Sequence, residues 1–326
     1  MEIKFYTAEI HKSLLDFMIA EYPNRDPKYL EWWLCHTKNA TEEEQKRTFV
    51  ITDKGEIIAC TTADWTRIKI KDSFHDFYWE ANTIVSPKYR GQGVGRMIFE
   101  QMDLYRDRCT TGFTDIAYKL QLQIIKHFKR INPVYVYLTF NRYCFKSFFC
   151  PRQFKDDLSV NERICYKSIS AELISSSDQL EIPDNGIWIN DEIELIRDER
   201  FIKKRFFNIY KKYFFYKINE KDKCVGYFVV RNIRYHNISM LSLVDYRYTD
   251  KKYLKYILSI ANIIARKNKI GFVLSLTSQV KIQRLIPFTI FTGKELYGGT
   301  TMPELKDGQE FLITSADSDL DFVYYK

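Results

Sequence analysis

Residues 85–95 read VSPKYRGQGVG, and three of the 12 glycines of this 326-residue chain fall within that one stretch. The stretch follows an apolar run at 77–85, whose β-branched and aromatic residues predict a strand. It precedes apolar residues at helical spacing, namely Val94, Met97, Ile98, Met102 and Tyr105. The sequence therefore predicts a glycine-rich turn between a strand and a helix.

A glycine-rich turn at a helix start is suited to binding an anion. The first helical turn leaves backbone N–H groups unpaired and carries about half a positive charge. Because glycines let a ligand approach the backbone closely, residues 92–96 could hold a phosphate, with Arg90 and Arg96 adding to the field. The sequence lacks the P-loop pattern GxxxxGK[ST], and its GxGxG spacing differs from the GxGxxG of dinucleotide-binding folds.

The same stretch resembles motif A of the GCN5-related N-acetyltransferases (GNAT), whose pattern is V-x-P-x-x-R-G-x-G-x-G. The matching residues are Val85, Pro87, Arg90, Gly91, Gly93 and Gly95. The resemblance covers roughly residues 1–140, and 112–121 resembles a later family segment, with Ala117 in place. Two residues depart from the pattern: Thr114 stands where asparagine is usual, and Gln121 stands where many members have a tyrosine that protonates the leaving thiolate.

The resemblance implies that the ligand is acetyl-CoA or another acyl-CoA. The pyrophosphate would bind backbone N–H groups of the turn, supplied by Gln92, Gly93, Val94, Gly95 and Arg96. The strand edge at Ile84 and Val85 would pair with the pantetheine arm, as an added strand pairs with an open sheet edge. The N–H of Val85 could also polarise the thioester carbonyl.

The family reaction is direct attack of an amine on the thioester, and the amine must first lose a proton. Glu80 is the first candidate base, because strand alternation places it on a polar face with Tyr78 and Asn82. An ion-paired structural glutamate is the alternative. His75 and Asp76 are other candidate bases, with an ordinary loop position as the alternative. Tyr118 is a candidate acid, with helix packing as the alternative. Cys60 and Cys109 could carry the acyl group, with a buried apolar thiol as the alternative.

The acceptor side is expected at the first helices, within residues 10–36. Trp32 and Trp33 could form a platform for a sugar or an aromatic acceptor, or could belong to the core. A primary amine on a small molecule or a peptide is the expected acceptor. An amino sugar is the favourite because aromatic residues make up 16% of the chain.

The chain length suits two domains. The predicted fold class is α/β (α+β), a GNAT fold whose mixed, mostly antiparallel sheet is flanked by helices, with a second GNAT-like domain. The predicted boundaries are a GNAT domain at 1–140, a connecting segment at 141–180 and a degenerate GNAT-like domain at 181–326, ending in a late strand at 310–314. The second strand-to-helix junction, at 241–257, has no glycine at its turn and carries Asp245 and Asp250, so we expect no anion site there.

Composition limits the other possibilities. The seven cysteines lack CxxC spacing and the five histidines lack ligand spacing, which predicts reduced thiols, a cytoplasmic location and no structural metal. No apolar run reaches eighteen residues, so a membrane span is not expected. The net charge is +8, and its densest patch, residues 203–217, alternates cations with aromatics.

The leading hypothesis is therefore an acyl-CoA-dependent N-acyltransferase, most simply an N-acetyltransferase. A non-catalytic acyl-CoA binder is the first alternative, since Gln121 replaces the usual tyrosine. A nucleic-acid-binding module centred on residues 203–217 is the second.

Overall fold

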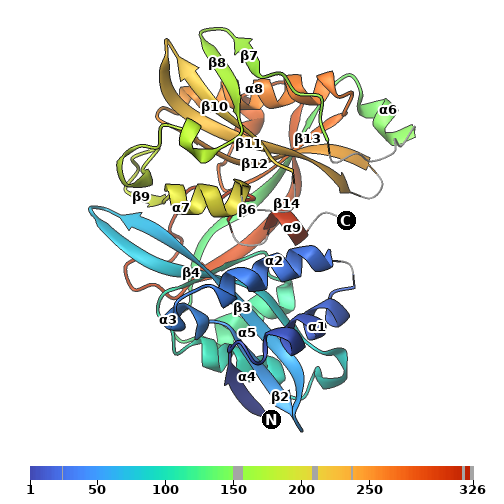
Figure 1. The fold of residues 1–326 in the computed structure, drawn as a ribbon, viewed down its shortest axis with the longest axis vertical. Coiled ribbons are helices and arrows are strands. Elements are labelled where there is room, and N and C mark those ends of the chain that lie inside the picture. Colours follow the sequence, from blue (N-terminus) through green and yellow to red (C-terminus); the bar gives the residue numbers. More distant parts are fainter. Residues whose placement is uncertain (24, 150–156, 208–211, 236–237, 318–319, 324–326) are drawn as a thin grey trace.

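The structure is a computed structural model that describes residues 1–326 except 24, 150–156, 208–211, 236–237, 318–319 and 324–326. Two lobes lie along the long axis of the molecule and share one sheet of 14 strands (Figure 1). The order in the sheet is β1-β2-β3-β4-β5-β14-β6-β13-β12-β11-β10-β8-β7, and β9 pairs with β3 outside this path. Most neighbours are antiparallel, which confirms the predicted mixed, mostly antiparallel sheet.

The strands are β1 (Glu2–Phe5), β2 (Phe49–Asp53), β3 (Glu56–Ile70), β4 (Ser73–Val85), β5 (Arg108–Thr111), β6 (Lys129–Phe140), β7 (Arg163–Tyr166), β8 (Ile169–Ile174), β9 (Ile193–Leu195), β10 (Phe214–Glu220), β11 (Lys223–Tyr235), β12 (Ile238–Tyr248), β13 (Phe272–Thr277) and β14 (Thr289–Thr300). The α-helices are α1 (His11–Glu21), α2 (Pro27–Lys38), α3 (Glu42–Gln45), α4 (Val94–Met102), α5 (Asp115–Ile124), α6 (Cys144–Phe149), α7 (Glu199–Ile202), α8 (Lys252–Lys267) and α9 (Leu320–Val323).

Local sequence explains where several elements of the first lobe begin and turn. Lys54 and Gly55 both have positive φ, so the predicted hairpin between β2 and β3 closes through the turn type that suits twisted strands. Asp26 caps α2, with Pro27 at the first helical position. Thr114 caps α5 by accepting a hydrogen bond from Ala117 N, so the threonine that departs from the family pattern performs an ordinary capping role.

Helices cover both faces of the first lobe's part of the sheet. Helices α1 and α2 bury Leu14, Met18 and Leu30 on one face, in a cluster that includes Ala81 of β4. Helix α4 and the partly buried side of α5 pack on the other face, over Phe49, Ile51 and other strand residues. The strand β4 therefore lies in a two-sided core, and its ends determine where a ligand could reach the sheet.

The second lobe repeats this order of elements. Strands β10, β11 and β12 form an antiparallel meander, and β12 leads into α8, which buries Leu254, Ile257 and Ala261 against the sheet. The strand β13 then lies parallel to β12. The two halves therefore share their architecture, as expected.

The predicted connecting segment at 141–180 contains β7 and β8, which extend the sheet beyond β10 because their residues pair with the meander. The domain boundaries stay a prediction, whereas the expected late strand was wrong. Residues 310–314 form no named strand; the last strand is β14, which lies between β5 and β6 and joins the lobes.

The remaining predictions at the level of the whole chain concern thiols, metals and membranes. The six cysteines that the structure describes are all free. Within the described ranges, no group of three or more His, Cys, Asp or Glu side chains lies close enough together to hold a metal ion. None of the helices in those ranges combines the length and the apolarity that a membrane crossing requires.

Candidate functional site

The predicted glycine-rich turn links β4 to α4 as expected. Gly91 and Gly93 adopt left-handed backbone conformations, with φ of +78° and +85°, and a Cβ at either position would meet no atom within 4 Å. Glycine is therefore required there for its conformation and not for space. Gly93 is the N-cap of α4, no side chain caps this helix end, and its first turn contains no acidic residue. The helix start is thus free of its own counter-anion.

Side chains of the turn hold its shape. Arg90 Nε donates to Val85 O at 3.1 Å, and Gln92 Nε2 donates to Lys88 O at 2.8 Å. Arg96 lies on the exposed side of α4, with its Nη1 3.9 Å from Glu100 Oε1. The predicted cations Arg90 and Arg96 therefore lie at the turn, but Arg90 also fastens the turn to the end of β4.

The strand β4 has an unpaired edge beside this turn. It pairs with β5 only through Tyr78–Arg108 and Trp79–Cys109, and β5 then continues alongside β14. From residue 80 to 85, none of the strand pairs that the structure describes joins β4 to β5. This edge, which includes Ile84 and Val85, leads directly to the start of α4, and we call the space between the diverging strands the first slot.

A β-bulge bends β4 at the first slot. The register with β3 shifts between Cys60 and Thr62, and Asn82 has a positive φ of 53°. Asparagine tolerates this conformation better than most residues. Asn82 Nδ2 donates to Thr62 Oγ1 at 3.0 Å, and Arg25 donates to Asn82 Oδ1. Sequence reasoning placed Asn82 only on a polar face, although an asparagine in mid-strand is a signal for such a bulge.

Glu80 is buried and paired rather than facing solvent. Arg108 Nε donates to Glu80 Oε1 at 2.5 Å, Thr61 Oγ1 donates to Glu80 Oε2 at 3.1 Å, and the Glu80 side chain is 1% exposed. Burial raises the pKa of Glu80, and the charge of Arg108 opposes that rise. The placement supports the ion-pair interpretation, because a carboxylate held by Arg108 is a poor acceptor for a substrate proton.

The other candidate bases and acids are dispersed. His75 Nδ1 lies 3.6 Å from Glu304 Oε1, and Asp76 pairs with Arg67 in the exposed part of the β3–β4 hairpin. Tyr118 stacks on Tyr297 with ring centroids 5.4 Å apart. These side chains therefore do not gather at the first slot.

The two candidate acyl-carrier cysteines are core residues. Cys60 and Cys109 are 0% and 1% exposed, and burial raises the pKa of both thiols. The buried-thiol interpretation fits their surroundings, because a buried neutral thiol is a weak nucleophile.

The two tryptophans of α2 have different environments. Trp33 is 4% exposed and belongs to the core, whereas Trp32 is half-buried and meets Trp33 edge to face at a centroid distance of 6.2 Å. Arg205 from the second half lies with its Cζ 6.0 Å from the centroid of Trp32. The face of α2 that carries Trp32 therefore meets the second half.

Arg205 belongs to a polar cluster with Tyr213 and Asp321. Arg205 Nη1 donates to Tyr213 Oη at 2.9 Å, and Arg205 Nη2 donates to Asp321 Oδ2 at 3.3 Å. In the rest of the basic stretch, Lys204 pairs with Asp64 and Lys212 pairs with Asp157, while 208–211 lie outside the described residues. These cations therefore have acidic partners within the protein. Because their charges are already balanced, they give less support to the hypothesis of a nucleic-acid-binding surface.

Comparison with known proteins finds a family match in the part of the chain that contains the glycine-rich turn. Residues 7–109 match the acetyltransferase (GNAT) family. No curated protein matches the sequence. The family match includes residues 85–95 and confirms the resemblance recognised there.

Solved structures share the fold across both halves. A GCN5-related N-acetyltransferase from Anabaena variabilis ATCC 29413 is 12% identical, with a TM-score of 0.59 over 92% of this chain and 72% of that chain. A probable N-acyltransferase from Enterococcus faecalis V583 is 13% identical, with a TM-score of 0.60 over 91% and 72%. N-myristoyltransferase from Saccharomyces cerevisiae with bound myristoyl-CoA is 11% identical, with a TM-score of 0.57 over 92% and 82%. The likeness thus extends beyond the family match into the second half.

Proposed function

We propose that the protein is an acyl-CoA-dependent N-acyltransferase whose donor site lies in the first half. One observation carries the proposal: the open edge of β4 leads directly to a helix start with no side-chain cap, through Gly91 and Gly93 in left-handed conformations. A long ligand with a pyrophosphate and an amide-containing arm matches this combination. The backbone of residues 92–96 would bind the pyrophosphate, and Ile84 and Val85 would pair with the arm.

The proposed reaction is the direct attack of a primary amine on the thioester. The nitrogen forms a bond to the carbonyl carbon, the carbon–sulfur bond breaks, and CoA leaves as the thiol after taking up a proton. Positioning both reactants contributes up to about 7–11 kcal/mol in favourable cases. The N–H of Val85 is the proposed donor to the developing oxyanion. Glu80 as the base stays a prediction, with its pairing to Arg108 as the competing role.

We propose acetyl as the transferred group. The first slot runs along residues 80–85 and is closed at its other end, where Trp79 pairs with Cys109. Both of these side chains are buried, at 2% and 1% exposure. Packed side chains at that end favour a short acyl chain. The N-myristoyltransferase fold relative carries myristoyl-CoA, so the fold alone does not limit the acyl length.

We propose a small amine as the acceptor, entering from the α2 face that carries Trp32. Half-buried Trp32 offers an aromatic face, which suits the ring of an amino sugar or the cationic amine of a peptide. The cytoplasm, where acyl-CoA and reduced thiols are available, is the proposed location.

The decisive experiment measures thiol release from acetyl-CoA against amino sugars, polyamines, amino acids and peptides, beside calorimetric titration with acetyl-CoA. Binding with acceptor-dependent thiol release supports the proposal. Binding without release for any acceptor favours a non-catalytic acyl-CoA binder, as the buried Glu80–Arg108 pair would allow. Absence of binding would remove both.

A further inference from the structure

Both halves contain a slot between diverging parallel strands. In the first half, β4 and β5 pair only through residues 78–79 and 108–109. In the second half, β12 and β13 pair only through residues 241–243 and 273–275. Each pair of strands then separates on the side that leads to the next helix, α4 after β4 and α8 after β12. We call the space between β12 and β13 the second slot.

The second slot is filled by the chain itself. Ala316 N donates to Val244 O of β12 at 3.0 Å. On the other side, Thr314 forms an antiparallel bridge with Thr277 of β13. Residues 311–317 therefore contact both strands at once, as an added strand does in an open sheet edge. In the second slot, the backbone of residues 311–317 occupies the place that corresponds to the proposed position of the pantetheine arm in the first slot.

The start of α8 is also occupied. Lys252 N donates to Asp250 Oδ1 at 2.8 Å, so a side chain of the protein supplies the anion at this helix end. Asp250 thus places its negative charge at this helix start, as expected, whereas Asp245 is completely buried and bound by Arg197 and Arg247. Protein groups therefore occupy, in the second half, the two places proposed for a CoA in the first half.

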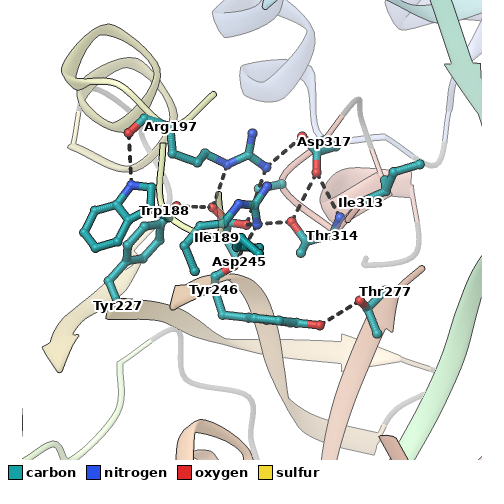
Figure 2. Close-up of polar contacts among 12 residues, drawn as sticks. Trp188, Ile189, Arg197, Tyr227, Asp245, Tyr246, Thr277, Ile313, Thr314 and Asp317 are labelled. Carbon is teal, nitrogen blue, oxygen red and sulfur yellow. Dashed lines mark hydrogen bonds and ion pairs between the residues drawn. The ribbon is translucent and has the colours of Figure 1, made fainter. Parts of the chain in front are cut away.

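A buried ionic network fastens residues 311–317 in the second slot (Figure 2). Thr314 Oγ1 donates to Asp245 Oδ1 at 2.7 Å, and Arg197 Nε donates to Asp245 Oδ2 at 3.0 Å. Arg197 Nη2 donates to Asp317 Oδ1 at 2.7 Å. All four side chains are at most 1% exposed. Buried charges of this kind cost desolvation energy that apolar packing would avoid, which is consistent with a role in fixing one geometry.

The fastened segment leads to α9, which lies against the first half. A Cβ placed on Gly112, just after β5, would lie 3.2 Å from Leu320 Cδ2. Leu320 packs in the same core cluster as Trp79 and Cys109, the residues that close the first slot. Asp321 binds Arg205, whose guanidinium approaches Trp32 of α2.

We infer that the second half is a holder for the chain's own C-terminal segment, and that Arg197, Asp245 and Asp317 are positioning residues that set α9 against the first slot. The inference rests on the proposed function in one respect, that the first slot is where acyl transfer takes place. In this arrangement the second half binds no acyl-CoA. The second slot affects catalysis indirectly: it holds residues 311–317, and these fix the position of α9 beside β5 at the closed end of the first slot.

The test compares Asp317→Asn with Asp307→Asn in the full chain. Asp307 pairs with Arg130 on the surface, at 53% side-chain exposure, and so provides a matched control in the same C-terminal region. Thr314→Val is a milder second variant that removes one donor to Asp245 and keeps the side-chain size. The readouts are hydrogen exchange of 311–317 and 109–112, acetyl-CoA affinity, and kcat/KM for the amine.

We expect Asp317→Asn to speed exchange in both segments and to lower kcat/KM for the amine by about tenfold or more, since small misplacements are costly in transfer reactions. Its acetyl-CoA affinity should stay within about twofold of the wild type, because the start of α4 packs in a different core cluster from α9. Thr314→Val should change exchange and kcat/KM in the same direction, Asp317→Glu should restore part of the rate, and Asp307→Asn should match the wild type.

The inference is overturned if Asp317→Asn or Thr314→Val loosens 311–317 while exchange at 109–112 and amine transfer stay at wild-type levels. It is also overturned if acetyl-CoA affinity falls in parallel with the transfer rate in Thr314→Val. A wild-type protein without acetyl-CoA binding would defeat the proposed function alone. In that case faster exchange at 109–112 in Asp317→Asn supports the placement of α9, and unchanged exchange overturns it.

Discussion

Arg197 donates a hydrogen bond to Asp317 at 2.7 Å, and both side chains are completely excluded from solvent. The two residues are 120 positions apart in sequence. Arg197 also binds Asp245 of β12, so one guanidinium links the segment before α7, the meander and the C-terminal segment. Burial would lower the pKa of Arg197, but the two carboxylates raise it, so the guanidinium stays charged.

This network predicts a loss of stability in acid. Burial would raise the pKa of Asp245, but Arg197 and Arg247 outweigh it and lower the pKa to about 2 from an ordinary value of 3.8. A carboxylate whose pKa is lowered on folding stabilises the protein above its unfolded pKa and loses that contribution as the pH falls through the folded one. We expect about 2 kcal/mol to be lost between about pH 4 and pH 2. Denaturant unfolding at several pH values measures this.

The matched variant for that experiment is Asp245→Asn. It should be less stable than the wild type at neutral pH, because Arg197 and Arg247 lose a buried partner. Its stability should change less than that of the wild type between pH 4 and pH 2. An equal loss in both proteins over that window would assign the acid sensitivity to other carboxylates.

The donor site can be tested at Gly95, in the first turn of α4. A Cβ there would lie 3.6 Å from Leu120 Cδ2, an ordinary contact, so both Gly95→Ala and Gly95→Asp should fold. Alanine should stabilise the helix by up to about 1 kcal/mol. Aspartate should weaken acetyl-CoA binding by about a hundredfold or more, because a like-charge contact at ~4 Å costs about 4 kcal/mol at an effective dielectric of 20.

Calorimetry on the wild type and both Gly95 variants measures these effects. Alanine with near wild-type affinity and aspartate without binding would place the pyrophosphate at the start of α4. Retained binding in a folded Gly95→Asp protein would move the donor site elsewhere.

Calorimetry also counts the sites. We expect one acetyl-CoA for each chain, because Asp250 and residues 311–317 occupy the corresponding places in the second half. The Gly95→Asp variant should then show none. A wild-type stoichiometry of two would contradict the account of the second slot.

Glu80 and Arg108 form the pair that separates a structural role from a catalytic one. Glu80→Gln should lower the free energy of unfolding by about 3–5 kcal/mol, because Arg108 would stay charged and buried without its partner. Adding Arg108→Met should restore most of that stability. If Glu80 only balances Arg108, the double variant also recovers transfer activity, whereas a base would not be replaced. The double-mutant cycle measures urea unfolding and thiol release for the wild type, Glu80→Gln, Arg108→Met and the double variant.

Trp79 is expected to limit the acyl chain. Trp79→Ala would leave a cavity at the closed end of the first slot and destabilise the protein by about 3–5 kcal/mol. The ratio of kcat/KM for hexanoyl-CoA to that for acetyl-CoA should rise, whereas Trp79→Phe, which retains an aromatic ring, should change it less. An unchanged ratio in a folded alanine variant would place the acyl group away from Trp79.

The anion-binding turn could be predicted from the sequence because it is a local structure. Gly91 and Gly93 need left-handed conformations, and the helix after them follows from its apolar spacing, so no distant residue is required. The hairpin at Lys54 and Gly55 was predictable for the same reason. Each depends on a few consecutive residues whose conformational preferences agree.

The roles of Glu80, Asp245 and the C-terminal segment were decided only by the tertiary structure. Glu80 meets Arg108 from another strand, and Asp245 meets Arg197, 48 positions away. A charged residue shows no sign in sequence of whether its partner is water or a buried guanidinium, because the energy depends on burial and on groups brought together by folding. Residues 311–317 begin with the apolar run Phe311 to Ile313, which is typical of a strand, and only their place between β12 and β13 shows that they fill the second slot.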